Sequence, residues 1–114
     1  MQTLEKNQAI FTRHVSQLIS FVFAQGYECT LGEAFRTQEQ AEIYAKNGKG
    51  IKNSLHCDRL AIDLNLFSPQ GKYLTDTKAY TEMGSYWKAL STANRWGGDF
   101  PKPDGCHFER RRSS

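Results

Sequence analysis

The stretch Ala61–Phe67, AIDLNLF, constrains the fold more than any other part of the chain. Its apolar and polar side chains alternate, which predicts a β-strand with Ile62, Leu64 and Leu66 on one face. The other face then carries Ala61, Asp63, Asn65 and Phe67. A carboxylate within such a strand is costly to desolvate, so Asp63 needs a partner, a metal ion or a chemical role.

Helical periodicity, capping residues and turn residues predict the other elements. The predicted helices span residues 3–25, 37–45 and 81–93, and the predicted strands span 27–35, 61–67 and 106–109. Residues 96–100 are expected to form a glycine-rich strand or turn, and residues 48–58 an exposed loop. Together these elements predict an α+β fold, in which helices pack around a small antiparallel β-sheet.

Length and composition indicate an ordinary globular protein. A chain of 114 residues is expected to form a single domain, 1–114, with a modest core. Its hydrophobic content of 39% and charged content of 24% are typical of water-soluble domains. No apolar run has the length of a membrane span, and the N-terminal residues lack a signal-peptide pattern. We therefore expect a protein without stable membrane insertion that is made in the cytoplasm, or that leaves it by a route that needs no cleaved signal. We also expect it to be a monomer.

Positive charge is concentrated near the C-terminus. The net charge is +3, and Arg110, Arg111 and Arg112 are adjacent. Such a tail suits anionic partners, including nucleic acid, lipid headgroups and cell-wall polymers, or it is simply solvated. A nucleic-acid role is disfavoured, because basic and aromatic residues do not interleave along a strand and the 12 acidic residues offset much of the charge.

The histidines include a candidate metal site. His14 lies off the apolar stripe of the first predicted helix, so we expect it to be exposed. His56, Asp63 and His107 form a candidate three-ligand set, because zinc accepts imidazole nitrogens and carboxylate oxygens. Three protein ligands with one open position are typical of a catalytic zinc site. From spacing alone, the two histidines fit a packed or hydrogen-bonded pair as well as they fit a metal site.

The three cysteines are an odd number and too few for a disulfide scaffold, so reduced thiols are expected. They are Cys29, Cys57 and Cys106. Cys57 follows His56 and Cys106 precedes His107. In extended segments each of these cysteines would point away from its histidine neighbour. A structural zinc site, which uses mostly cysteine ligands, is therefore not expected.

Asp104, three residues before His107, is a candidate general base. A carboxylate near an activated water can take its proton and return it to a leaving amine. The alternative is structural, since Pro-Asp-Gly is a common turn in which the aspartate only holds the backbone. Asp58, Asp99 and Glu109 are rival bases, and Glu109 shares the face of His107 on the predicted strand.

Four stretches of this sequence resemble one peptidase family. SLHCDRLAID (54–63) resembles the S-x-H-x-x-x-x-x-x-D motif of the zinc D-Ala-D-Ala peptidases and of the phage endolysins that cut L-alanyl-D-glutamate bonds, peptidase family M15. DGCHFE (104–109) resembles the second motif of that family, an acidic residue three positions before histidine. EAFRTQEQ (33–40) is similar to its G-x-R-T-x-x-x-Q segment, and WGGDF (96–100) to the segment before the second motif. The matches follow the family's order over residues 29–109.

The resemblance implies roles for individual residues. The zinc ligands would be His56, Asp63 and His107. Asp104 would be the general base, and Arg36 would contact substrate and stabilise the developing oxyanion. Ser54 would hydrogen-bond substrate near the metal. Gln40 would also bind substrate, although helix capping explains it equally well.

The chain also departs from the family pattern in two places. Many members carry glutamate at the position of Asp104, although a phage-type subset has aspartate. Ala34 and Phe35 replace the more usual small residue and tyrosine before Arg36. The first departure requires the loop to bring the shorter side chain closer to the metal, and the second affects the shape of the substrate cleft.

By resemblance, the expected function is zinc-dependent hydrolysis of the peptidoglycan stem peptide at the L-alanyl-D-glutamate bond, in phage- or prophage-type lysis. Such an enzyme would stay in the cytoplasm until it is released to the cell wall. D-alanyl-D-alanine carboxypeptidase activity is the first alternative. The second is a non-catalytic, zinc-stabilised wall-binding module, because the same fold, by resemblance, includes the hedgehog signalling domains. A binding module would need no base, so Asp104 together with Arg36 favours an enzyme.

Overall fold

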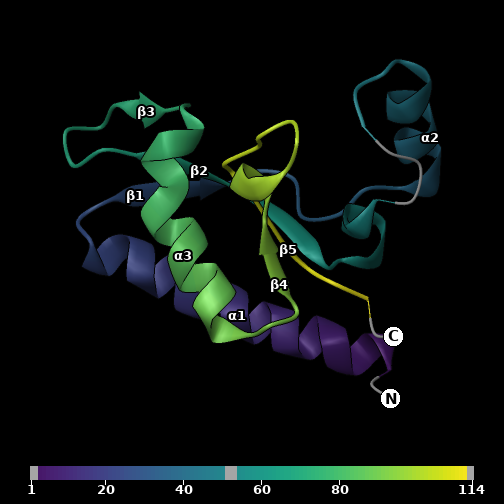
Figure 1. Cartoon of the computed structure of the whole chain (residues 1–114), viewed down its shortest axis with the longest axis horizontal. Coiled ribbons are helices and arrows are strands. Elements are labelled where there is room, and N and C mark those ends of the chain that lie inside the picture. The colour runs from purple at the N-terminus through teal and green to yellow at the C-terminus, as the bar shows by residue number, and fades with distance from the viewer. Residues whose placement is uncertain (1–2, 51–53, 113–114) are drawn as a thin grey trace.

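The computed structural model describes residues 3–50 and 54–112. Its helices are α1 (Leu4–Ala24), α2 (Gln38–Lys46) and α3 (Thr81–Leu90). Its strands are β1 (Glu28–Leu31), β2 (Ala61–Phe67), β3 (Tyr73–Leu74), β4 (Asn94–Trp96) and β5 (His107–Arg110). Short 3₁₀ helices span Leu55–Asp58, Thr77–Tyr80 and Gly97–Asp99. Figure 1 shows α1 and α3 packed against the sheet, with α2 set apart from them at the upper right.

The strands form one antiparallel sheet in the order β1-β2-β5-β4, and β3 also pairs with β2. The predicted strand 61–67 has the same bounds in the structure. Ile62, Leu64 and Leu66 are buried, as their alternation predicts. The prediction of an α+β fold with a small antiparallel sheet is confirmed.

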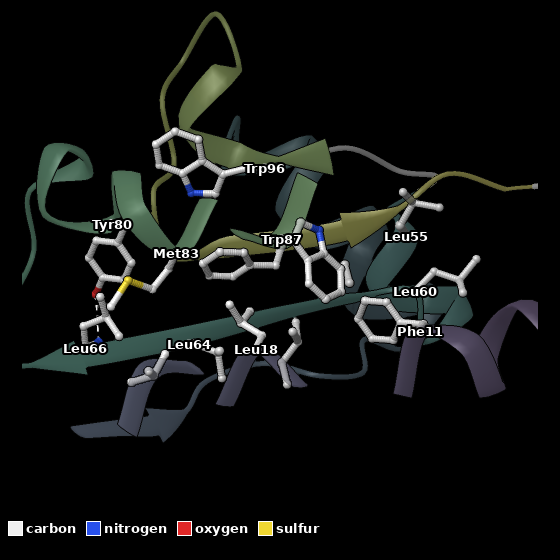
Figure 2. Close-up of a cluster of buried hydrophobic side chains, with 14 residues drawn as sticks. Phe11, Leu18, Leu55, Leu60, Leu64, Leu66, Tyr80, Met83, Trp87 and Trp96 are labelled. Atoms are coloured by element: carbon white, nitrogen blue, oxygen red, sulfur yellow. Dashed lines mark hydrogen bonds between the residues drawn. The ribbon is translucent and has the colours of Figure 1, made fainter. Parts of the chain in front are cut away.

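The core lies between this apolar face of β2 and the two longer helices (Figure 2). It includes Phe11, Leu18 and Val22 from α1 and Met83 and Trp87 from α3. Replacing a fully buried side chain of this size by alanine costs about 3–5 kcal/mol. Because the core occupies one face of β2, the opposite face, which carries Asp63, is free to form a site.

The first helix begins and ends close to the predicted positions. The Thr3 hydroxyl accepts a hydrogen bond from the Lys6 amide at 3.2 Å, and Gly26 follows the helix with φ +88°. The expectation for His14 was wrong, because this side chain is half-buried. Its Nδ1 lies 3.2 Å from Asn94 Nδ2, and its ring meets Trp87 edge to face. Burial accordingly lowers the pKa of His14, against an opposing contribution from the hydrogen bond with Asn94.

Other boundaries differ from prediction where tertiary contacts override local pattern. The strand predicted over 27–35 is regular only over Glu28–Leu31, and the helix predicted over 81–93 ends at Leu90. The stretch 96–100 divides between the end of β4 and a 3₁₀ turn. The last strand begins at His107 and extends to Arg110.

The segment 48–58, predicted as an exposed loop, is only partly one. Ser54, Leu55 and His56 are buried, and Leu55–Asp58 is a 3₁₀ helix. Residues 51–53 lie outside the described part of the chain. The apolar Leu55 joins the core, which explains why this polar stretch folds inward instead of remaining in solvent.

Candidate functional site

Strand pairing brings Asp63 and His107 together. The two residues are directly opposite each other in the antiparallel pair β2–β5. Cross-strand partners share a face of the sheet, so both side chains point away from the core. Asp63 Oδ1 lies 3.3 Å from His107 Nδ1. The strand pairing therefore places the Asp63 carboxylate against the His107 imidazole, which is the partner that a carboxylate in this strand requires.

His56 reaches the same place from the 3₁₀ helix that precedes β2. The Ser54 hydroxyl caps this helix by accepting a hydrogen bond from the His56 amide at 3.2 Å. Arg59, with φ +54°, then turns the chain into the strand. The His56 side chain is only 3% exposed, and its Nε2 lies 3.5 Å from Asp63 Oδ1. A tight cap and turn thus direct the imidazole to the polar face of β2.

The three side chains fit a zinc ion. One donor atom from each of His56, Asp63 and His107 can be chosen so that all lie within 4.8 Å of one another. Tetrahedral ligands at about 2.0–2.1 Å from zinc are roughly 3.3 Å apart. The two distances from Asp63 Oδ1, 3.5 and 3.3 Å, are close to that spacing. Two imidazoles and one carboxylate leave one position open, as in catalytic sites.

Hydrogen bonding in this cluster outweighs burial in setting the charge of its members. Burial by itself would raise the pKa of Asp63, but hydrogen bonds and charge interactions with His107 and His56 lower it to about 2. Burial would lower the pKa of His107, but Asp63 and Glu109 raise it to about 9. At neutral pH the cluster therefore combines an ionised carboxylate with a protonated imidazole, and a cation bound there would displace the imidazole proton.

Asp104 lies beside the cluster, on the loop that leads into β5. Its amide donates to the Gly97 carbonyl at 2.9 Å, and its own carbonyl accepts from the His107 amide at 3.1 Å. A carboxylate oxygen of Asp104 lies within 4.8 Å of one of Asp63. The side chain is exposed, so water can reach its carboxylate. These contacts place a second carboxylate next to the candidate metal position.

The rival bases have other partners. Asp58 pairs with Arg112, and Asp99 pairs with Lys88 Nζ at 2.8 Å. Neither aspartate lines the pocket that contains the cluster. Glu109 does line it, but its Oε1 lies 2.7 Å from His107 Nε2. The geometry therefore favours Asp104 over the three alternatives.

A cavity of about 520 Å³ opens over the cluster. Its walls include Arg112 of the basic C-terminal cluster and three basic side chains that the sequence did not single out, Lys49, Arg95 and Lys102. Among the residues that the structure describes, Lys49 and Lys102 form no ion pair. Their positions depend on loops that meet only in three dimensions, so nothing in the sequence marked them as neighbours of the site.

Arg36 also lines the cavity. Its amide donates to the His56 carbonyl at 3.2 Å, which connects the β1–α2 segment to the candidate metal ligands. The guanidinium pairs with Glu33 and lies over the Tyr44 ring, 4.9 Å from its centroid. The side chain is 14% exposed. Glu33, which the sequence analysis did not identify, therefore orients the arginine at the edge of the pocket.

Ser54 lines the pocket, but Gln40 does not. The hydroxyl of Ser54 is used as the cap of the helix that carries His56. Gln40 lies in the first turn of α2, where its amide donates to Thr37 Oγ1 at 3.1 Å. The predicted cap at Thr37 is thus present, and Gln40 is not among the residues that line the cavity.

The cysteines differ in their relation to the site. Cys57 lies in the 3₁₀ helix, and its thiol donates a long hydrogen bond of 3.9 Å to the Thr37 carbonyl. Cys106 precedes β5, so strand alternation does not direct its side chain away from the site. Its sulfur lies 3.4 Å from Asp104 Oδ1 and within 4.8 Å of an Asp63 oxygen. Burial and the nearby carboxylates raise the pKa of the Cys106 thiol to about 12.

The described helices include none that is both long and apolar enough to cross a lipid bilayer.

Comparisons with known proteins bear on the family and the fold of this chain. A family model described as D-alanyl-D-alanine carboxypeptidase matches residues 47–110, which include all three members of the cluster and Asp104. The fold is similar to the crystal structure of the Serratia marcescens L-Ala D-Glu endopeptidase ChiX, with a TM-score of 0.73 and 17% sequence identity. That alignment covers 93% of this chain and 84% of the other. A search of curated proteins finds no match. The family match extends over more than half of the sequence, and this chain therefore belongs to the D-alanyl-D-alanine carboxypeptidase family of M15 peptidases.

Proposed function

We propose that this protein is a zinc-dependent peptidoglycan hydrolase that cleaves the L-alanyl-D-glutamate bond of the stem peptide. The observation that carries the proposal is the convergence of His56, Asp63 and His107 beside Asp104. The similarity in fold to an L-Ala D-Glu endopeptidase supports the choice of bond. Lysis of the phage or prophage type is the proposed biological role.

His56 Nε2, Asp63 Oδ1 and His107 Nδ1 would hold the zinc ion. When bound there, the ion would supply Lewis acidity, which polarises a carbonyl oxygen and lowers the pKa of water in the site. Asp104 is an exposed carboxylate next to Asp63, so it would accept a proton from the attacking water. The same carboxyl group would then return the proton to the nitrogen of the leaving amine.

Arg36 would bind the substrate in the same cavity. Its guanidinium is held by Glu33 and Tyr44, so little side-chain freedom remains to be lost on binding. A fixed cation next to the scissile carbonyl would stabilise negative charge as it develops on the oxygen. Lys49 and Lys102 add positive charge to the cavity walls, which suits a stem peptide with free carboxylates.

D-alanyl-D-alanine carboxypeptidase activity is the second candidate function. The observation that favours it is the description of the family model that matches residues 47–110. Both reactions hydrolyse an amide bond with the same metal, base and arginine. They differ in where the substrate lies in the cavity, so the products distinguish them.

The test is mass spectrometry of peptidoglycan fragments after incubation with zinc-loaded protein. A chelated sample and the variant His56→Ala, which removes one proposed ligand, serve as inactive references. The variant His14→Gln changes a histidine outside the cavity and serves as the active control. Zinc-dependent fragments that end in free L-alanine would support the endopeptidase. Loss of one terminal D-alanine would establish the carboxypeptidase instead. No product with zinc fully bound would overturn both in favour of a binding module.

A further inference from the structure

One contact of the cluster is not explained by metal binding or by catalysis. His107 presents Nδ1 to Asp63, and its second nitrogen, Nε2, lies 2.7 Å from Glu109 Oε1. The ring is thus held between two carboxylates, one at each nitrogen. An ionised carboxylate only accepts hydrogen bonds, so the contact with Glu109 requires the proton to be on Nε2. With Nε2 protonated, Nδ1 is the nitrogen that can bind a metal ion once its own proton is displaced.

Glu109 is itself held in place by a second contact. Its other oxygen, Oε2, lies 2.6 Å from a terminal nitrogen of Arg95, which is its cross-strand partner on β4. The Glu109 side chain is only 9% exposed, whereas that of Arg95 is 51% exposed. Both oxygens of a nearly buried carboxylate are therefore used, one by a histidine and one by an arginine at the surface. Such pairing offsets the cost of burying the charge.

The backbone of this pair is anchored in the core. The Trp87 indole nitrogen donates to the carbonyls of both Arg95 and Glu109, at 3.0 Å each. Trp87 is fully buried on α3. The orientation of the Glu109 carboxylate is thus set by the sheet and by the helix behind it. A second carboxylate ligand would need to point at the cluster, whereas Oε1 of Glu109 contacts the far side of the His107 ring.

We propose that Glu109 is a positioning residue that fixes the tautomer and orientation of His107, and that Arg95 clamps Glu109 in the required geometry. The proposal rests on the zinc site proposed above. Carboxylate partners of metal-binding histidines typically change metal affinity by about 10–100-fold when they are removed. Glu109 therefore acts on the metal through His107 and is not itself a ligand.

The experiment measures zinc affinity by competition with a chelator, and the Nε2–H signal of His107 by ¹⁵N NMR of the zinc-loaded protein. Glu109→Ala is expected to weaken zinc binding by about 10–100-fold and to lose the protected, hydrogen-bonded Nε2–H signal. Glu109→Gln retains an acceptor without the charge, so it should recover the NMR signal and part of the affinity. Arg95→Ala, at an exposed position, should give a smaller loss of affinity. Asp99→Ala removes an acidic side chain outside the cavity and should leave both measurements unchanged.

Unchanged affinity and an unchanged Nε2–H signal in Glu109→Ala would overturn the inference while leaving the zinc site in place. A parent protein that binds no zinc would instead refute the proposed function. If Glu109→Ala does not fold, Glu109→Gln and Arg95→Ala decide the question, because neither creates a large cavity. Parent-like zinc affinity in both of these variants would then exclude the positioning role.

Discussion

At the scale of single residues, Asp104 is the side chain whose removal should separate chemistry from metal binding. Asp104→Asn keeps the size and the loop contacts of the residue but removes its ability to take a proton. We expect turnover to fall by about 10²–10⁴-fold, because general base catalysis contributes that much. Zinc content, measured by atomic absorption, should be unchanged. Asp99→Asn is the matched control, and turnover equal to that of the parent in Asp104→Asn would show that another group is the base.

Arg36 should affect turnover in a different way, because it contributes positive charge without contacting the metal. Arg36→Ala is expected to lower turnover by about 10²-fold, the effect of losing one oxyanion donor. Zinc should remain bound in this variant. Arg59→Ala is a suitable control, since this guanidinium lies over the Phe35 ring, 4.1 Å from its centroid, and does not line the cavity. An Arg36→Ala variant as active as the parent would remove the residue from the mechanism.

Cysteine variants test which residues hold the metal. The Cys106 variant is the more stringent test of the ligand set, because the Cys106 sulfur lies close enough to Asp63 and Asp104 to form an alternative group of metal ligands. Under the proposed ligand set, Cys57→Ser and Cys106→Ser should both keep one zinc ion per chain, as measured by mass spectrometry of the native protein. Loss of metal from Cys106→Ser would mean that the alternative group is the true site.

At the scale of elements, Gly97 controls how closely β4 approaches the loop before β5. A methyl group added here would lie 2.2 Å from the Asp104 carbonyl oxygen and 2.8 Å from His107 Cβ. We expect Gly97→Ala to push the Asp104 loop away and to weaken both zinc binding and turnover. The measurements are chelator competition and kinetics, with thermal melting alongside.

Gly71→Ala is the control for that variant. Gly71 has φ +87° and open space around its Cβ position, in the turn between β2 and β3. The Gly71→Ala variant should have a lower melting temperature, because alanine at this backbone angle adds strain of about 1 kcal/mol, and its zinc affinity should be unchanged. If Gly97→Ala binds zinc as tightly as the parent, the close packing of Gly97 against the Asp104 loop is not needed for the site.

At the scale of the whole molecule, the net charge is +3, and several of the basic side chains line the cavity, where they would affect substrate binding. Lys49 and Lys102 line the cavity and have no ion-pair partner among the residues described. The double variant Lys49→Ala, Lys102→Ala should raise KM for an acidic stem peptide by about two- to fivefold. That change in binding is what the loss of exposed charge pairs usually causes. The increase should shrink at high salt, because exposed charges are screened.

Lys72→Ala with Lys78→Ala makes the same change in net charge away from the cavity. Steady-state kinetics at two salt concentrations should show KM close to that of the parent for this control. If both double variants raise KM equally, the effect comes from total charge, and the cavity lysines have no special part in substrate binding.

Across the molecule, the accuracy of sequence-based prediction followed the range of the interactions involved. Strand 61–67 and helix α1 were predicted well because periodicity and caps are local properties of the chain. The 3₁₀ helix at Leu55–Asp58 was not predicted, because only its contact with the core buries that polar stretch. Strand β3 has two residues, and its extended form depends on pairing with β2.

The sequence by itself determined the α+β fold class, the polar face of β2 and the identity of the candidate ligand residues. These follow from alternation along a strand and from which side chains can bind zinc. Only the tertiary structure decided that His107 lies opposite Asp63, that Glu109 occupies its second nitrogen, and that Arg36 is held by Glu33. Strand register and loop packing arise from the whole core, and a linear pattern contains no measure of those long-range contacts.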